Sequence, residues 1–120
     1  MSAFARVLGA LTTAYGVAVV VRPSVLTGPA GLGPRDGDPS PHVATLARAV
    51  GVRDAVSGLA VALAPRGRAM QVALAVRVAA DIGDAVTLGT ATSDPDTARK
   101  IVAVAGGWAA LNALALATAR

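Results

Sequence analysis

Six charged residues interrupt two otherwise apolar segments, 43–64 and 69–91, which a tight turn at 65–68 joins. They are Arg48, Arg53, Asp54, Arg77, Asp81 and Asp84. If the two segments fold back on each other as helices, residues equally far from the turn lie level. The expected pairs are Arg48 with Asp84, Arg53 with Asp81, and Asp54 with Arg77. The charges then neutralise one another, so the sequence predicts a buried polar network, where we expect any chemistry.

Two aspartates in this set have the spacing of an acid/base pair. Asp81 and Asp84 are one helical turn apart, so their negative charges would repel in a medium of low dielectric constant. One of them is then expected to keep its proton while Arg77 holds the other in its charged form. A neutral acid beside a carboxylate can protonate and deprotonate a lipophilic molecule, as in isomerisation, cyclisation or epoxide opening. Asp54, Asp81 and Asp84 are the candidate catalytic residues.

A second set of side chains is expected to line the same interior. The candidate binding residues are Arg48, Arg53, Arg77, Trp108 and Asn112. Trp108 and Asn112 are one helical turn apart, so both can face the network from the last helix. The pattern also fits an alternative in which the whole network is structural and fixes the register of the helices. The sequence leaves both interpretations open.

Other kinds of site fit the residues poorly. A metal ion would have to use the three aspartates and the lone His42 against three competing arginines, so we expect neither a metal nor a cofactor. The chain has no cysteine, which excludes disulfides and thiolate chemistry. Its formal charge is +4, but the arginines are scattered and there is one Phe, one Tyr and one Trp. Nucleic-acid binding favours a clustered basic patch with stacking aromatics, so we do not expect it.

The charged segments are two of four expected helices. The sequence predicts helices at about 3–21, 41–64, 68–91 and 95–119, in a single all-α domain that covers 1–120. Ser40-Pro41 and Asp94-Pro95 are typical helix starts, with a capping side chain followed by proline at the first helical position. No segment alternates polar and apolar residues with a period of two, so no sheet is expected.

The composition favours a membrane. Mean hydropathy is +0.60 and 15% of residues are charged, against about 25% in soluble domains. The segments 7–21 and 101–119 are uncharged and nearly long enough to span a bilayer. Helix 68–91 should not insert alone, because its three charges cost about 2.5–3.5 kcal/mol each at mid-bilayer. It is expected to insert together with helix 41–64, with the charges facing inward.

These observations predict a four-helix transmembrane bundle, a multi-pass protein of the cell (plasma) membrane that can form oligomers. The alternatives are a soluble alanine-rich bundle and a cleaved signal peptide at the N-terminus. Basic residues are equal in number on the two sides, but the tight, doubly basic turn at 65–68 favours cytoplasmic N- and C-termini. The loop 22–41, rich in proline and glycine, is either a lid over the mouth of the bundle or a flexible tether.

The charged segments also carry a resemblance. The run Ala47-Arg48-Ala49-Val50-Gly51-Val52-Arg53-Asp54, followed by Gly58, Arg77, Asp81 and Asp84, resembles a family of small four-helix membrane proteins of unknown function. The family occurs in bacteria and fungi, and its layout is similar to that of DoxX-like proteins. The resemblance covers helices 41–64 and 68–91. It implies a four-helix membrane fold with these charges at its core, and it implies no reaction.

Three functions follow as hypotheses. The first is a membrane protein whose buried Arg/Asp pocket, between helices 41–64 and 68–91, binds a small lipophilic molecule. The second is a cofactor-free membrane enzyme, an isomerase, cyclase or hydrolase that uses Asp81 and Asp84. The third is a structural or assembly subunit of a membrane complex. A cavity beside the two aspartates favours the first two, and a dry, fully paired network favours the third.

Overall fold

The computed structural model of the protein describes residues 2–34 and 37–119. These residues form four long helices and one short one, with no strand among them. The helices are α1 (Ser2–Val21), α2 (Ser24–Thr27), α3 (Pro41–Leu63), α4 (Arg68–Ala91) and α5 (Pro95–Thr118). The all-α prediction is therefore confirmed, and the bounds of the long helices agree with the predicted ones to within one residue. The short helix α2 was not predicted and lies in the expected loop 22–41.

The starts of α3 and α5 follow the prediction to different degrees. The carboxylate of Asp94 accepts hydrogen bonds from the backbone N–H groups of Asp96 and Thr97 at 3.3 and 3.4 Å, and from the hydroxyl of Thr97 at 2.6 Å. The Thr97 hydroxyl, together with these N–H groups, lowers the pKa of Asp94. Ser40 makes no such bond, although α3 begins at Pro41 as predicted. The first turn of α3 thus relies on the fixed backbone of proline at its first position.

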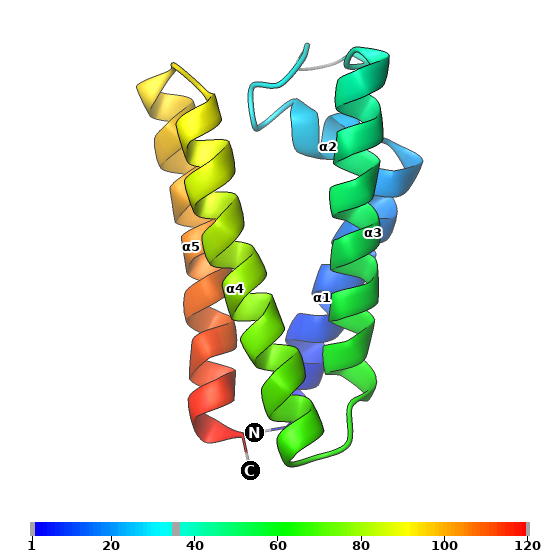
Figure 1. Ribbon diagram of the computed structural model, residues 1–120, viewed down its shortest axis with the longest axis vertical. Helices are drawn as coiled ribbons and strands as arrows, with labels where there is room; N and C mark the ends of the chain where they lie inside the picture. The colour runs from blue at the N-terminus through cyan, green and yellow to red at the C-terminus, as the bar shows by residue number, and fades with distance from the viewer. Residues whose placement is uncertain (1, 35–36, 120) are drawn as a thin grey trace.

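The long helices form two antiparallel pairs, α1 with α3 and α4 with α5 (Figure 1). The pairs meet at the end where α1 begins and α5 ends, which we call the closed end, and diverge toward the open end, where α2 lies between them. The sequence predicted that α3 and α4 would pack along each other as a hairpin. That prediction is wrong, because α3 packs along α1 and has far fewer contacts with α4.

Glycine residues allow α1 and α3 to pack in direct contact. Gly9 and Gly16 of α1 face Gly58 and Gly51 of α3, and a Cβ atom built on Gly9 would lie 2.6 Å from the carbonyl oxygen of Gly58. A Cβ atom built on Gly16 would lie 2.5 Å from the carbonyl oxygen of Gly51. The two backbones are therefore in direct contact, an approach that only the smallest side chains permit.

Two arginines bond α1 to α3 at the two ends of the pair. Arg6 donates from Nη1 to the carbonyl of Ala62 at 2.6 Å and from Nη2 to that of Ala64 at 3.1 Å. Arg48 donates from Nε to the carbonyl of Val20 at 3.1 Å. Each helix thus supplies a cation to the carbonyl end of the other, where backbone oxygens lack partners within the helix.

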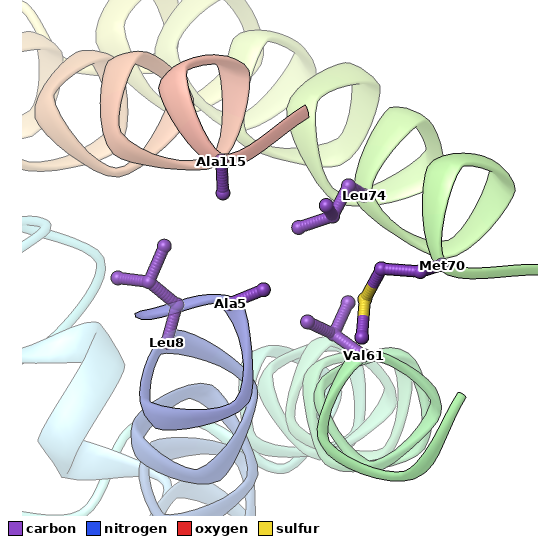
Figure 2. Close-up of a cluster of buried hydrophobic side chains, with 6 residues drawn as sticks. All are labelled: Ala5, Leu8, Val61, Met70, Leu74 and Ala115. Atoms are coloured by element: carbon purple, nitrogen blue, oxygen red, sulfur yellow. The ribbon is translucent and has the colours of Figure 1, made fainter. Parts of the chain in front are cut away.

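A cluster of apolar side chains joins the two pairs at the closed end (Figure 2). Its members come from all four long helices and are Ala5, Leu8, Val61, Met70, Leu74 and Ala115. Val61 and Leu74 are fully buried. The pairs are therefore held together at one end by apolar packing, and the charged residues lie further toward the open end.

The outer surface is apolar on every long helix. Large hydrophobic side chains such as Val21, Leu63 and Val104 are 76%, 70% and 63% exposed, and others lie along the whole length of the bundle. The buried polar side chains, by contrast, include Asp54, Arg77, Asp81 and Asn112. By length and composition, two helices in the described part of the chain could cross a membrane: α1 from Ala3 to Val21, and α5.

Candidate functional site

Arg77 is the centre of the polar network. It projects from α4, its side chain is 4% exposed, and its Nη1 atom donates to Asp54 Oδ1 and to Ser57 Oγ on α3, both at 2.9 Å. Its Nη2 atom donates to Asp81 one turn further along α4. One guanidinium group therefore joins the two helix pairs and holds two carboxylates at once.

Arg53 forms the second crossing. Its Nη1 and Nη2 atoms donate to the two carboxylate oxygens of Asp84 at 2.9 and 2.7 Å. Its Nη2 and Nε atoms also donate to Asp54 Oδ1, at 2.9 and 3.2 Å. The Arg53 side chain is 39% exposed, whereas that of Asp84 is 18% exposed, so this crossing lies at the edge of the network.

The network differs from the expected one in two respects. The pair of Asp54 with Arg77 forms as predicted, but Arg53 binds Asp84 and not Asp81. Arg48 does not join the network: it is exposed and bonded to the end of α1. The physical reason is the divergence of the helix pairs (Figure 1), since positions equally far from the turn stay level only in helices that pack along each other.

Because Arg48 lies outside the network, the net charge of the network differs from the predicted one. Two arginines, Arg53 and Arg77, now face three aspartates, Asp54, Asp81 and Asp84. The predicted set of six charges was neutral. The observed set of five carries a net charge of −1 when all its members are ionised.

Asn112 joins the network from α5, as the sequence predicted. Its side chain is 1% exposed and its Nδ2 atom donates to the carbonyl of Trp108 at 2.9 Å and to Asp81 Oδ2 at 3.4 Å. Asp81 is therefore held from α4 by Arg77 and from α5 by Asn112. Three of the four long helices, α3, α4 and α5, therefore contribute polar side chains to the network.

A cavity of about 880 Å³ lies beside the network. Its polar floor is formed by Asp54, Arg77, Asp81 and Asp84. Its apolar walls include Val50 of α3, Leu88 of α4, and Ile101 and Val104 of α5, and both Tyr15 and Trp108 line it. The carboxylates proposed for catalysis thus face a space large enough for an organic molecule, since sites for such ligands span about 300–1,000 Å³.

Residues 25–33 lie over this cavity and supply part of its lining, including Val25, Leu26 and Pro29. Thr27 is fully buried and Ala30 is 4% exposed. Gly31 has a φ of +70°, and a Cβ atom built on it would lie 3.3 Å from Thr97 Cγ2 at the start of α5. The segment therefore reaches from the α1–α3 pair to α5. Of the two interpretations of loop 22–41, this position fits a lid.

Two contributors were missed by the sequence-based prediction. Ser57 accepts a hydrogen bond from Arg77 and donates one to the carbonyl of Arg53 at 2.7 Å. It lies one turn beyond Asp54 on α3, and that spacing was a usable signal. Tyr15, the residue before Gly16, lines the cavity from α1, but nothing in its neighbours marks it as a lining residue.

Neither a metal site nor a role for the lone histidine follows from the arrangement. Within residues 2–34 and 37–119, no group of three or more His, Cys, Asp or Glu side chains could hold a metal ion. His42 is exposed in the first turn of α3 and does not line the cavity.

Comparison with known proteins gives no assignment. No protein-family model, curated protein or solved structure matches this chain. Membership of the four-helix family named above stays a prediction. A function must therefore be inferred from the geometry of this chain.

Proposed function

We propose that this is an integral membrane protein whose interior cavity binds a small lipophilic molecule. The observation that carries the proposal is the reversed distribution of its side chains. Asp54, Arg77 and Asp81 are at most 4% exposed, while large apolar side chains cover the outside of every long helix. A protein in water favours the opposite arrangement, and a bilayer favours this one.

The dimensions of the bundle support a bilayer. The four long helices have 20, 23, 24 and 24 residues, so they are about 30–36 Å long. The hydrocarbon core of a bilayer is about 30 Å thick. Exposed charges lie at the two ends, such as Arg68 at the closed end and Asp38, Arg99 and Lys100 at the open end. We assign the closed end, with the turn at 65–68 and both termini, to the cytoplasmic side of the cell membrane.

The charges of α3 and α4 fit this assignment because they face each other. Every carboxylate of the network bonds a guanidinium group, and the best buried of them, Asp54 and Asp81, bond the buried Arg77. Ionisable residues within membranes are tolerated where they pair inside the bundle. All four long helices can therefore span the bilayer, although α3 and α4 are too polar to do so alone.

Ligand binding is supported by the cavity and by the incomplete bonding of its floor. Arg77 Nε is buried without a hydrogen-bond partner among the described residues. All three donors to Asp54 bind its Oδ1 atom, and Asp54 also lines the cavity. A purely structural ion network, as in an assembly subunit, would satisfy its buried polar atoms. At Arg77 the network is not fully paired among the described residues.

The membrane assignment can be tested by cysteine accessibility, since the native chain has no cysteine. We would compare Leu111→Cys, on the outer face of α5, with Ala69→Cys and Ser93→Cys at the two ends. In intact vesicles a water-soluble maleimide should label the end positions from opposite sides and leave the middle one unlabelled. Equal labelling of all three positions without detergent would reject the assignment.

Catalysis is the second candidate function. Asp81 and Asp84 face the same cavity, and the excess of carboxylates over guanidiniums allows one of them to hold a proton. This is the arrangement that a cofactor-free acid/base isomerase, cyclase or hydrolase needs. If Asp81→Asn and Asp84→Asn both fold, bind ligand and turn it over as the wild type does, catalysis by these residues is rejected and binding stands.

A further inference from the structure

The charge of the cavity floor is unbalanced. Asp54, Asp81 and Asp84 line the cavity, and two guanidinium groups, those of Arg53 and Arg77, pair with them. With all five groups ionised, a net charge of −1 remains. An uncompensated charge in a medium of low dielectric constant is unfavourable. Lys100 also lines the cavity but is exposed at its open end, so on the floor itself either a proton on one carboxyl group or a bound cation can neutralise the charge.

We infer that the cavity binds a lipophilic cation, a molecule that carries a protonated amine or quaternary ammonium group on a compact hydrocarbon body. This inference rests on the proposed function and adds the charge of the ligand. The cationic group lies against the carboxylates of Asp81 and Asp84. The hydrocarbon body lies among the apolar side chains of the walls, such as Val50, Leu88 and Val104.

The guanidinium groups that pair with the floor's carboxylates are largely engaged within the network. Each Nη atom of Arg53 and Arg77 already donates to a carboxylate of the network. The other basic side chain in the described lining is Lys100, which is exposed at the open end. An anion on the floor would therefore add to an existing excess of negative charge, and a cation would cancel it.

The aromatic residues of the chain point to the same class of ligand. The sequence contains one Phe, one Tyr and one Trp, and both Tyr15 and Trp108 line the cavity. Aromatic faces attract ammonium groups through their quadrupole, most strongly where water is excluded. Two of the three aromatic side chains thus lie in the space that also holds the excess carboxylate.

The floor also lacks a partner for a buried group. The side chain of Arg77, a lining residue, is 4% exposed, and its Nε–H has no hydrogen-bond acceptor among the described residues. Buried donors are nearly always bonded in a completed site. This orphan donor is independent of the charge count. An ammonium group cannot accept its hydrogen bond, so a water held with the ligand would complete the floor at Arg77.

The test uses three probes that share one hydrocarbon body and differ in charge: 1-aminoadamantane, 1-adamantanol and 1-adamantanecarboxylate. Each is titrated into the full-length protein in uncharged phosphatidylcholine nanodiscs at pH 7, and binding to empty nanodiscs is subtracted. We expect the amine to bind at least about tenfold more tightly than the alcohol, with the carboxylate weakest, because only the amine cancels the excess charge.

The outcomes separate this inference from the proposed function. Tighter binding of the amine supports both. Equal binding of amine and alcohol overturns the inference, since a proton then neutralises the floor, and it leaves the lipophilic binding site in place. Preference for the carboxylate also overturns the inference alone. Absence of binding by all three probes overturns both.

Two variants move the charge in opposite directions. Asp81→Asn should make the floor neutral, so the amine and the alcohol should then bind with about equal affinity. Unchanged binding of the alcohol is the control for folding. Arg53→Gln, at the half-exposed edge of the network, should raise the excess to −2 and increase the advantage. Loss of structure would weaken binding of every probe. A higher amine-to-alcohol affinity ratio in Arg53→Gln would therefore show that Arg53 acts through its charge and not through the structure. An unchanged amine-to-alcohol ratio in both variants would overturn the inference.

Discussion

Arg53 and Asp84 form a two-point ion pair that joins α3 to α4, with Nη1–Oδ1 and Nη2–Oδ2 distances of 2.9 and 2.7 Å. The helix pairs touch through apolar side chains mainly at the closed end, so this ion pair and the bonds of Arg77 connect them further toward the open end. Paired geometry of this kind requires the planar fork of a guanidinium group. The following predictions begin with this contact.

Arg53→Lys should weaken the connection although it keeps the charge. An ammonium group cannot bond both oxygens of Asp84 in the same geometry and also reach Asp54. We expect the free energy of unfolding in mixed micelles to fall by about 1 kcal/mol. Arg48→Lys is the matched control, because Arg48 is outside the network and should change stability by less than about 0.5 kcal/mol. Equal losses in the two variants would contradict a connecting role for Arg53.

Arg77→Met should be the most damaging single change in the network. It leaves Asp54 with only the edge residue Arg53, and Asp81 with only Asn112, in a buried position. Breaking a buried ion pair by removing one partner costs about 3–5 kcal/mol. The double variant Arg77→Met/Asp81→Leu removes an orphaned carboxylate together with its partner, so it should be more stable than Arg77→Met alone. A double variant that is less stable than the single one would contradict the proposed electrostatic cause.

Gly16→Ala should destabilise the α1–α3 pair. The added Cβ atom would meet backbone atoms of α3 at 2.4 and 2.5 Å, and backbone cannot move aside as a flexible side chain can. We expect a loss of about 1–3 kcal/mol, measured by unfolding in mixed micelles. Gly83→Ala is the control, since nothing lies within 4 Å of its Cβ position. It should be neutral or stabilising by up to about 1 kcal/mol, because alanine is the better helix former.

The start of α5 should weaken in acid. The pKa of Asp94 is lowered, so its charged form stabilises the first turn at any pH above the ordinary pKa of aspartate, about 3.9. That contribution is lost as the pH falls through the lowered pKa. Hydrogen-exchange protection of the Asp96 and Thr97 amides should therefore decrease below pH 4. In Asp94→Asn the same amides should lose this pH dependence, whereas Asp96→Asn, in the same turn, should keep it.

Gly31→Val should open the segment over the cavity. Valine is strained at a φ of +70°, and its side chain would press on Thr97. A cysteine placed in the cavity by Val50→Cys should then react faster with a maleimide than it does behind the native segment. Gly67→Val is the control: it has a φ of +96° and carries similar strain, but nothing lies within 4 Å of its Cβ position in the turn at the closed end. Equal acceleration by both variants would indicate general loosening.

The sequence determined the helices and the need to bury their charges. Pro41, Asp94 and Pro95 act on the residues next to them, so the helix starts could be predicted from local pattern alone. The bond between Arg77 and Asp81 was also predictable, because residues four apart on one helix are always neighbours. The sequence also spaces Gly9 from Gly16 and Gly51 from Gly58 by seven residues each, which places each pair on one helix face, but it does not show which faces meet.

Only the tertiary structure decided which helices pair, and with that the composition of the site. Contact between Gly16 and Gly51 draws α3 to α1, so α3 and α4 diverge and Arg48 bonds Val20 in place of Asp84. The cavity, its cover by residues 25–33 and the excess negative charge all follow from that divergence. The physical reason is that contacts between helices depend on how closely and at what angle two backbones approach, and the number of residues from a turn carries neither quantity.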